Sequence, residues 1–250
     1  MHSTPSSKVI LITGGAKRVG AAITRALHRQ HAQVMIHYHT SKAEALALVA
    51  ELNALRADSA APVQADLLHT AELPKLVEAT LQRFGRLDAL INNASAYYST
   101  ELGHIDEQQW QDLMGSNLKA PLFLSQAAAP ALIDTQGCIV NITDMHIERP
   151  KKHYIVYSIA KAGLATLTKS LAQELSPHVR VNAVAPGPVL WPDENLEFDA
   201  VYRQQVIAQT LLKRSGEPDD IAKAVKFLVY DAPFVTGHVL AVDGGRHLSL

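Results

Sequence analysis

The sequence predicts an α/β fold, a single doubly wound domain built on a mostly parallel sheet. Short apolar runs alternate with longer helical patterns from one end of the 250 residues to the other. The runs are continuous and rich in β-branched residues, as expected for strands that are buried on both faces. Alternation of this kind places helices on both faces of a parallel sheet. No linker, repeat or low-complexity stretch divides the chain, so we expect one domain over residues 1–250.

Seven apolar runs are predicted strands. They are expected at 8–13, 33–37, 63–65, 87–92, 137–142, 178–183 and 238–242. Helices are expected at 19–29, 41–56, 70–84, 106–133 and 154–175, with two more before the last strand. Ser41 with Glu44 three residues later is typical of a helix start, and Gly85 is typical of a helix end. Pro121 falls inside 106–133 and predicts that this helix is in two pieces.

Composition and charge exclude several classes of protein. The chain is 48% hydrophobic and 19% charged, which is ordinary for a globular fold with a substantial core. It has 23 Lys and Arg against 24 Asp and Glu, so no net charge drives it toward nucleic acid or an anionic membrane. The single cysteine, Cys138, is expected to be buried and excludes an internal disulfide. No apolar run approaches a signal peptide or a membrane span, and the expected compartment is the cytoplasm.

A glycine-rich turn follows the first predicted strand. Its glycines, Gly14 and Gly20 among them, would let the backbone approach a pyrophosphate at the start of the next helix. An ordinary strand–turn–helix is the alternative, but the position directly after the first strand favours a nucleotide site.

The end of the second strand indicates which dinucleotide binds. Residues 37–42 carry no acid, whereas NAD-binding proteins use an acid there for the ribose hydroxyls. Arg18, His39 and Ser41 are candidates to hold the 2′-phosphate of NADP. His37 and His39 share one face of the strand and could instead bind a metal, but no third ligand is in sight and no metal is expected.

Tyr157 and Lys161 are the strongest candidates for catalysis. They lie four residues apart on one helix face, which continues through Leu164 and Thr168 and is predicted to point inward. An ammonium close to a phenol lowers the pKa of the phenol, so that Tyr157 could deliver a proton near neutral pH. A surface Tyr–Lys pair is the structural alternative.

Together these elements resemble the short-chain dehydrogenase/reductase family over essentially the whole chain. The motifs fall in the family's order, from the glycine-rich turn through 92–94, Asn117, Tyr157, Lys161 and 182–187 to 242–245. The resemblance implies a Rossmann-type sheet of about seven strands, hydride transfer from a nicotinamide and a homotetramer. It also implies that Asn117, Tyr157 and Lys161 are parts of the catalytic relay.

Three departures from the family pattern resemble its pteridine reductase subgroup, and bacterial members most of all. Arg18 replaces a glycine of the turn, and Ser95 replaces the glycine that usually follows 92–94. Asp144 stands thirteen residues before Tyr157, where the family has its catalytic serine. A serine hydroxyl would hold a ketone oxygen, whereas a carboxyl can pair with a ring nitrogen or an amino group.

The resemblance carries over to particular residues. It places Arg18, His37, His39 and Ser41 around the adenosine phosphate, with Asp66 and Leu67 near the adenine. The other residues implied to bind the cofactor are Gly14, Lys17, Val19, Gly20, Tyr38, Asn93, Ala94, Ser95, Tyr157, Lys161, Pro186 and Gly187. Substrate contacts are implied for Ser95, Tyr97, Asp144, Tyr157 and Trp191, with the pterin stacked between Tyr97 and the nicotinamide. Thr40 stands where a trypanosomatid-type member has arginine, which would weaken the grip on the 2′-phosphate.

The implied activity is an NADPH-dependent reduction of a C=N bond in a dihydropterin, a dihydrofolate or an oxidised pterin. Asp144 and Tyr157 would supply the proton, while Lys161 would hold the ribose and lower the pKa of Tyr157. An NADPH-dependent carbonyl or 3-oxoacyl reductase is the alternative enzyme, and an NADPH-binding sensor or scaffold is the alternative outside catalysis. The partner is then a small pterin or folate, with no nucleic acid or membrane. The pair Lys151-Lys152 is predicted to be a solvated loop.

Overall fold

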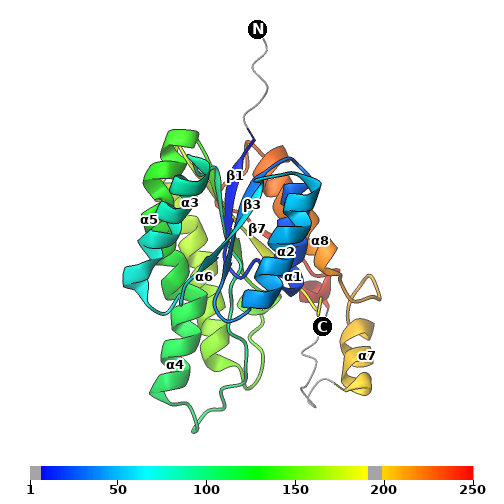
Figure 1. The fold of residues 1–250 in the computed structure, drawn as a ribbon. Helices are drawn as coiled ribbons and strands as arrows, with labels where there is room; N and C mark the ends of the chain where they lie inside the picture. Colours follow the sequence, from blue (N-terminus) through cyan, green and yellow to red (C-terminus); the bar gives the residue numbers. More distant parts are fainter. Residues whose placement is uncertain (1–6, 191–198, 250) are drawn as a thin grey trace.

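The computed structural model describes residues 7–190 and 199–249, and its sheet has seven strands (Figure 1). They are β1 (Val9–Ile12), β2 (Gln33–Tyr38), β3 (Ala60–Gln64), β4 (Ala89–Asn92), β5 (Cys138–Ile142), β6 (Arg180–Pro186) and β7 (Val239–Val242). All pair in parallel, in the order β3-β2-β1-β4-β5-β6-β7. The direction of winding reverses between β1 and β4, and a doubly wound sheet binds its ligands outside the carboxyl ends of strands at such a reversal.

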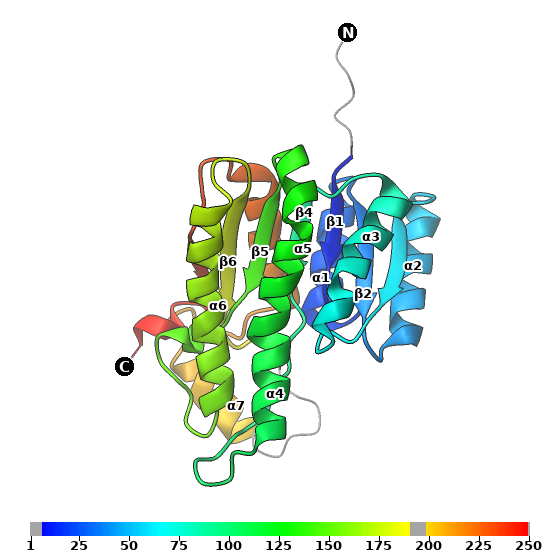
Figure 2. The ribbon, with the colours of Figure 1, turned by 90° about the vertical axis from the view of Figure 1, so that its left-hand side faces the viewer.

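Helices cover both faces of the sheet. On one face lie α1 (Arg18–His28), α2 (Lys42–Leu55) and α8 (Pro218–Lys226). On the other lie α3 (Leu73–Phe84), α5 (Ala120–Thr135) and α6 (Ile155–Glu174) (Figure 2). Two further helices, α4 (Glu107–Met114) and α7 (Ala200–Ala208), extend past the carboxyl ends of the strands. The short turns are η1 (Thr70–Glu72), η2 (Gly115–Lys119), η3 (Met145–Ile147), η5 (Phe227–Asp231) and η6 (Arg246–Leu248).

The predicted parallel sheet is confirmed, with small shifts at two strand ends. β3 begins at Ala60 instead of 63, because the segment from Ala60 onward already pairs with β2. β6 runs from Arg180 to Pro186 instead of 178–183, because its last residues pair with β7.

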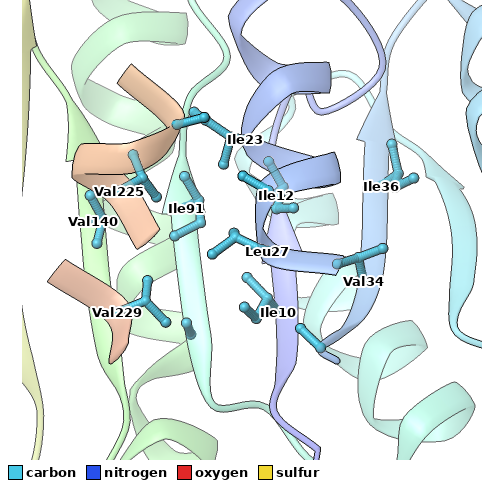
Figure 3. Close-up of a cluster of buried hydrophobic side chains, with 14 of the residues drawn as sticks. Ile10, Ile12, Ile23, Leu27, Val34, Ile36, Ile91, Val140, Val225 and Val229 are labelled. Atoms are coloured by element: carbon cyan, nitrogen blue, oxygen red, sulfur yellow. The ribbon is translucent and has the colours of Figure 1, made fainter. Parts of the chain in front are cut away.

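Both faces of the central strand are buried, which explains its unbroken apolar sequence. Ile10 and Ile12 belong to a cluster with α1 and α8, where they meet Ile23, Leu27 and Val225 (Figure 3). Leu11 points to the opposite face and joins the core beneath α3 and α5. A strand alternates its side chains between the two faces, and burying each Ile or Leu contributes about 1.5–3 kcal/mol.

Some of the predicted helix ends are found in the structure and others differ. Gly85 ends α3 in the left-handed conformation, with φ of 80°, as predicted. Ser41 lies at the N-cap of α2, but its side chain makes no capping hydrogen bond. The break predicted near Pro121 lies earlier, in the π-helical turn η2, and Pro121 itself stands in the first turn of α5. Proline is tolerated there because the first N–H groups of a helix have no intrahelical partner.

α6 turns its predicted inward stripe to the core. Tyr157, Lys161, Leu164 and Thr168 are all buried. Gly163 allows a close approach to η2, because a Cβ there would lie 2.7 Å from the Cδ2 atom of Leu118. Cys138 is buried, as predicted. Within residues 7–190 and 199–249 no helix has the length and apolar character that a membrane crossing needs.

Candidate active site

The turn between β1 and α1 is built for close backbone contact. Gly14 has φ of +60°, and a Cβ on Gly20 would lie 2.0 Å from the carbonyl oxygen of Gly14. Asn93, directly after β4, donates from Nδ2 to the carbonyl oxygens of Thr13 at 2.9 Å and Gly14 at 3.0 Å. The turn therefore has the shape of a dinucleotide cradle, and any side chain at Gly20 would collide with the turn itself.

Arg18 adopts a conformation that normally belongs to glycine. Its φ is 52°, in the left-handed region, which costs a non-glycine residue about 1 kcal/mol. This observation explains why a glycine is the usual residue at this position of the family's turn. The chain therefore carries the guanidinium of Arg18 at this position despite the conformational free energy that its backbone costs.

Beyond the turn lies a cleft, called here the glycine-turn cleft, that gathers the predicted cofactor residues. Its lining includes Gly14, Lys17, Arg18, Val19, Gly20, His37, Tyr38, His39, Ser41, Asp66, Leu67, Asn93, Ala94 and Ser95. Asp112 and Ser116 also line the cleft, although the sequence analysis did not predict them. They are four residues apart, a spacing that places two side chains on the same face of a helix.

Carboxylates neutralise part of the rim of the glycine-turn cleft. Lys17 pairs with Glu44 at 3.2 Å. Asp66 lies between two imidazoles, 4.0 Å from Nε2 of His39 and 3.6 Å from Nδ1 of His69. Lys17 and His39, both predicted to bind the cofactor, therefore each lie beside a carboxylate.

His37 lies behind the turn, and both of its ring nitrogens have backbone partners. Its Nδ1 accepts a hydrogen bond from the N–H of Gly14 at 3.1 Å, and its Nε2 lies 3.2 Å from the carbonyl oxygen of Ala65. These partners assign the proton to Nε2. Burial lowers the pKa of His37 to about 4, so the ring is neutral at pH 7 and has no donor left for a phosphate. We assign His37 to the support of the glycine-rich turn.

Asp144, Tyr157 and Lys161 come together at the carboxyl ends of β5 and β6. The hydroxyl of Tyr157 donates to Oδ2 of Asp144 at 2.7 Å. The other oxygen of Asp144 accepts from the N–H of His146 at 2.7 Å and so caps η3. Nζ of Lys161 donates to the carbonyl oxygen of Ile142 at 2.9 Å. Each side chain of the predicted catalytic group is therefore held by at least one hydrogen bond.

The pKa of Tyr157 is raised, not lowered as the sequence predicted. Burial is the main cause, and the carboxylate of Asp144 adds to it. The ammonium of Lys161 is 5.8 Å from the ring centroid of Tyr157, and burial lowers the pKa of Lys161 to about 8. Tyr157 therefore keeps its proton near neutral pH and can act as a donor.

Asn117 positions a loop rather than contacting Tyr157 or Lys161. From the π-helical turn η2, its Nδ2 donates to the carbonyl oxygens of Ala96 and Leu113, each at 2.9 Å. Its Oδ1 accepts from the hydroxyl of Ser95 at 2.6 Å. Among the hydrogen bonds of the described residues, none joins Asn117 directly to the catalytic pair.

A second cleft, called here the tyrosine cleft, opens onto Asp144 and Tyr157. Its lining also includes Arg18, Val19, Tyr97, Met145, His146, Lys151, Pro186, Gly187, Tyr202 and Arg246. Arg18 and Val19 line both clefts, so the two adjoin at the start of α1. Trp191, also predicted to contact substrate, lies outside the described residues. Three residues of this lining were not predicted to reach the site. Lys151 was expected to be solvated, and Tyr202 and Arg246 come from segments distant in sequence from Tyr157.

Comparison with known proteins agrees with this fold. A family model described as enoyl-(acyl carrier protein) reductase matches residues 14–247. Pteridine reductase 1 of Leishmania tarentolae is 36% identical over 290 aligned residues, covering 100% of this chain and 99% of that protein. A 3-oxoacyl-(acyl-carrier-protein) reductase of Staphylococcus epidermidis is 33% identical over 245 residues, covering 97% and 100%.

The fold and the match to known proteins define an oxidoreductase. The chain belongs to the short-chain dehydrogenase/reductase family. Relatives of this kind typically use NADH or NADPH, and the glycine cradle and its adjoining cleft fit such a dinucleotide.

The neutral state of His37 makes stability pH-dependent. Its pKa is about 4 in the fold and about 6.5 in an unfolded chain, so its stabilising effect is full above pH 6.5 and is lost as the pH falls toward 4. His37→Gln keeps an acceptor and a donor but does not titrate. Between about pH 7 and pH 5, the unfolding free energy of the parent should fall by about 2 kcal/mol more than that of the variant. Urea unfolding measures this, with the exposed His39→Gln as control, and parallel curves would contradict it.

Lys161 is expected to cost stability at neutral pH. Its pKa of about 8 lies below the unfolded value of about 10.4, so the penalty is full below pH 8 and fades as the pH rises. Lys161→Met should raise the unfolding free energy by about 1–3 kcal/mol at about pH 7 and lower turnover at least about 100-fold. The exposed Lys169→Met on the same helix is the control. A Lys161→Met protein less stable than its parent at pH 7 would refute the sign.

Proposed function

We propose that the chain is an NADPH-dependent pteridine reductase that reduces a C=N bond of a dihydropterin, a dihydrofolate or an oxidised pterin. The observation that carries this proposal is the hydrogen bond of 2.7 Å between Tyr157 and Asp144. The carboxyl group of Asp144 lies in the tyrosine cleft, at the position where related ketone reductases have serine. The similarity to a pteridine reductase along the whole chain supports the same conclusion.

A carboxylate at Asp144 selects for nitrogen-containing substrates. An ionised carboxylate only accepts hydrogen bonds, so it attracts ring N–H and amino groups and repels the lone pairs of a ketone oxygen. Hydrogen bonds of this type with an ionised partner are also stronger than neutral ones. A pterin offers such donors along one edge, whereas a simple ketone offers none.

Tyr157 is placed to hand a proton to the substrate nitrogen. Its raised pKa keeps the phenol protonated, and Asp144, which accepts its hydrogen bond, can relay a replacement proton from solvent in the open cleft. When bound, NADPH would supply the hydride that balances this proton. Lys161 places a positive charge beside Tyr157 as the tyrosine gives up its proton, and this charge is present below about pH 8. Activity should therefore decline above that pH.

The walls of the tyrosine cleft fit a flat ligand. Tyr97 is 38% exposed in the cleft, and its ring stacks on Tyr154 with a centroid separation of 4.8 Å. The ring of Tyr157 stands nearly perpendicular to that of Tyr97, at 79°. Aromatic faces of this kind favour an offset-stacked planar ring.

NADPH is the proposed cofactor because the chain offers positive charge and lacks an acid where NAD-binding proteins have one. The segment from His37 to Lys42 has no carboxylate, and Arg18 lines the glycine-turn cleft. We further propose that the enzyme acts in the cytoplasm as a homotetramer, without nucleic-acid or membrane partners. The half-exposed apolar side chains of Leu122 and Phe123 on α5 and Ile159 on α6 support an interface between copies.

A 3-oxoacyl or other carbonyl reductase is the second candidate, favoured by the 33% identity to an enzyme of that activity. Oxidation of NADPH measured side by side with dihydrobiopterin, dihydrofolate and a β-ketoester separates the two. Turnover of the ketoester alone would reverse the order of the candidates. Binding of NADPH without any turnover would favour a sensor or scaffold.

Replacement of Asp144 tests the carboxylate directly. We expect Asp144→Ser to lower kcat/KM for dihydrobiopterin at least about 100-fold, because the acceptor for ring N–H groups and the proton relay to Tyr157 are both lost. Reduction of a β-ketoester should be unchanged or improved. Asp134→Ser, at an exposed position on α5, is the control. Undiminished pterin turnover in Asp144→Ser would sink the assignment.

Arg18 should determine the preference for NADPH over NADH. Arg18→Gly removes the guanidinium and restores the residue type that tolerates a φ of 52°. We expect the KM for NADPH to rise about tenfold and the KM for NADH to change less than about twofold, because only NADPH has the extra phosphate. An equal change for both cofactors would show that Arg18 does not contact the 2′-phosphate.

A further inference from the structure

Lys151 inserts its ammonium among tyrosine side chains in the tyrosine cleft. Its Nζ lies 3.0 Å from the hydroxyl oxygen of Tyr97 and 3.8 Å from the ring centroid of Tyr154. The ring of Tyr202 is 6.0 Å away. The sequence predicted a solvated pair of lysines, and the structure separates the two, because Lys151 is half-buried while Lys152 is exposed.

These contacts define the orientation of the Tyr97 ring. Tyr154 stacks on it at 4.8 Å with an interplanar angle of 23°, and Tyr157 meets it at 4.8 Å and 79°. Stacking alone leaves the ring free to slide in its plane, whereas a donor on the hydroxyl restrains that movement. The hydrogen bond from Lys151 needs the hydroxyl of Tyr97, which a phenylalanine lacks.

The two loops that hold Tyr97 and Lys151 are tied together by their backbones. Thr100, buried in the loop after β4, donates its N–H to the carbonyl oxygen of His153. The hydroxyl of Thr100 accepts from the N–H of Val156 at 3.2 Å. The contact between Lys151 and Tyr97 therefore joins loops whose separation is already set, which lowers the entropy cost of forming it.

We propose that Lys151 is a positioning residue that fixes the ring of Tyr97 as a flat wall of the cleft and so favours planar substrates over aliphatic ketones. This role rests on the proposed function, in which a pterin stacks on Tyr97. A cation near an aromatic face attracts the ring, most of all where water is excluded. Loss of the ammonium leaves the ring of Tyr97 less restrained and weakens stacking without removing any group that transfers a proton.

A double-mutant cycle tests the pair. Lys151→Met keeps most of the aliphatic stem and removes the ammonium, and Tyr97→Phe keeps the ring and removes the hydroxyl. Each should raise the KM for dihydrobiopterin about five- to tenfold with kcat changed less than about twofold. The double variant should be no worse than Lys151→Met alone, because both changes remove the same contact. Lys151→Arg should restore the parent KM to within about threefold.

Lys152→Met is the matched control, since it removes the same charge from the neighbouring exposed position. It should leave both kinetic constants unchanged. Calorimetric binding of biopterin to the enzyme mixed with NADP should rank the variants in the same order without turnover. The KM for a β-ketoester should not rise in Lys151→Met, and thermal unfolding of each variant checks that the fold is kept.

Two results would overturn the role of Lys151 and leave the proposed function intact. One is a Lys151→Met enzyme that behaves like Lys152→Met with dihydrobiopterin. The other is a double variant whose KM increase equals the product of the two single increases, which would show independent effects. A parent enzyme that reduces no dihydropterin would instead overturn the proposed function and this inference together.

Discussion

The contact between the carbonyl of Gly14 and the backbone of Gly20 is the constraint on which the site depends. It brings the start of α1 so close to the end of β1 that a single methyl group would not fit. Neighbouring strands maintain the contact, through Asn93 after β4 and His37 at the end of β2. A charged imidazole would lose its acceptor nitrogen, so the turn also depends on keeping His37 neutral. The side chains of His37 and Asn93 behind the turn thus hold its backbone in the shape of a dinucleotide cradle.

Around Tyr157 and Lys161, burial destabilises the charged form of an ionisable side chain. Lys161 is surrounded by protein and has one backbone acceptor, so its charge is held at an energetic disadvantage. The same lack of solvent strengthens the effect of that charge on Tyr157 whenever the tyrosine gives up its proton. Stability and proton transfer therefore place conflicting demands on one ammonium group, which is common where a fold retains a buried ionisable side chain.

The sequence predicted the sheet well because its signal is local. Continuous apolar runs such as the one at Ile10 and Ile12 are possible only where both faces of a strand are covered. The inward stripe from Tyr157 to Thr168 could also be predicted from the sequence, since helical spacing alone places these residues on one face. The family resemblance supplied most residues of the glycine-turn cleft, while Tyr157, Pro186 and Gly187 line the adjoining tyrosine cleft.

The sequence predictions failed where the environment of a side chain depends on residues distant in the chain. Alternation along β2 could not reveal that both nitrogens of His37 meet backbone atoms. Adjacent lysines look alike in the sequence, and only the structure shows that Lys151 contacts Tyr97, in a segment that Thr100 and His153 tie to the loop after β4. The pKa of Tyr157 depended on Asp144 and on burial more than on the lysine one helical turn away.

The π-helical turn η2 has a consequence for how insertions and deletions would act on this fold. Such a turn holds one residue more than the α-helix around it, so η2 offsets the angular register of α4 against α5 by about 100°. With that offset, Asp112 and Ser116 reach the glycine-turn cleft while Leu113 packs with Tyr154 and Tyr157. Loss of one residue from 115–119 would rotate α4 about its own axis and exchange these faces. The wall behind Tyr157 is thus set by the number of residues in this helical segment as well as by their identity.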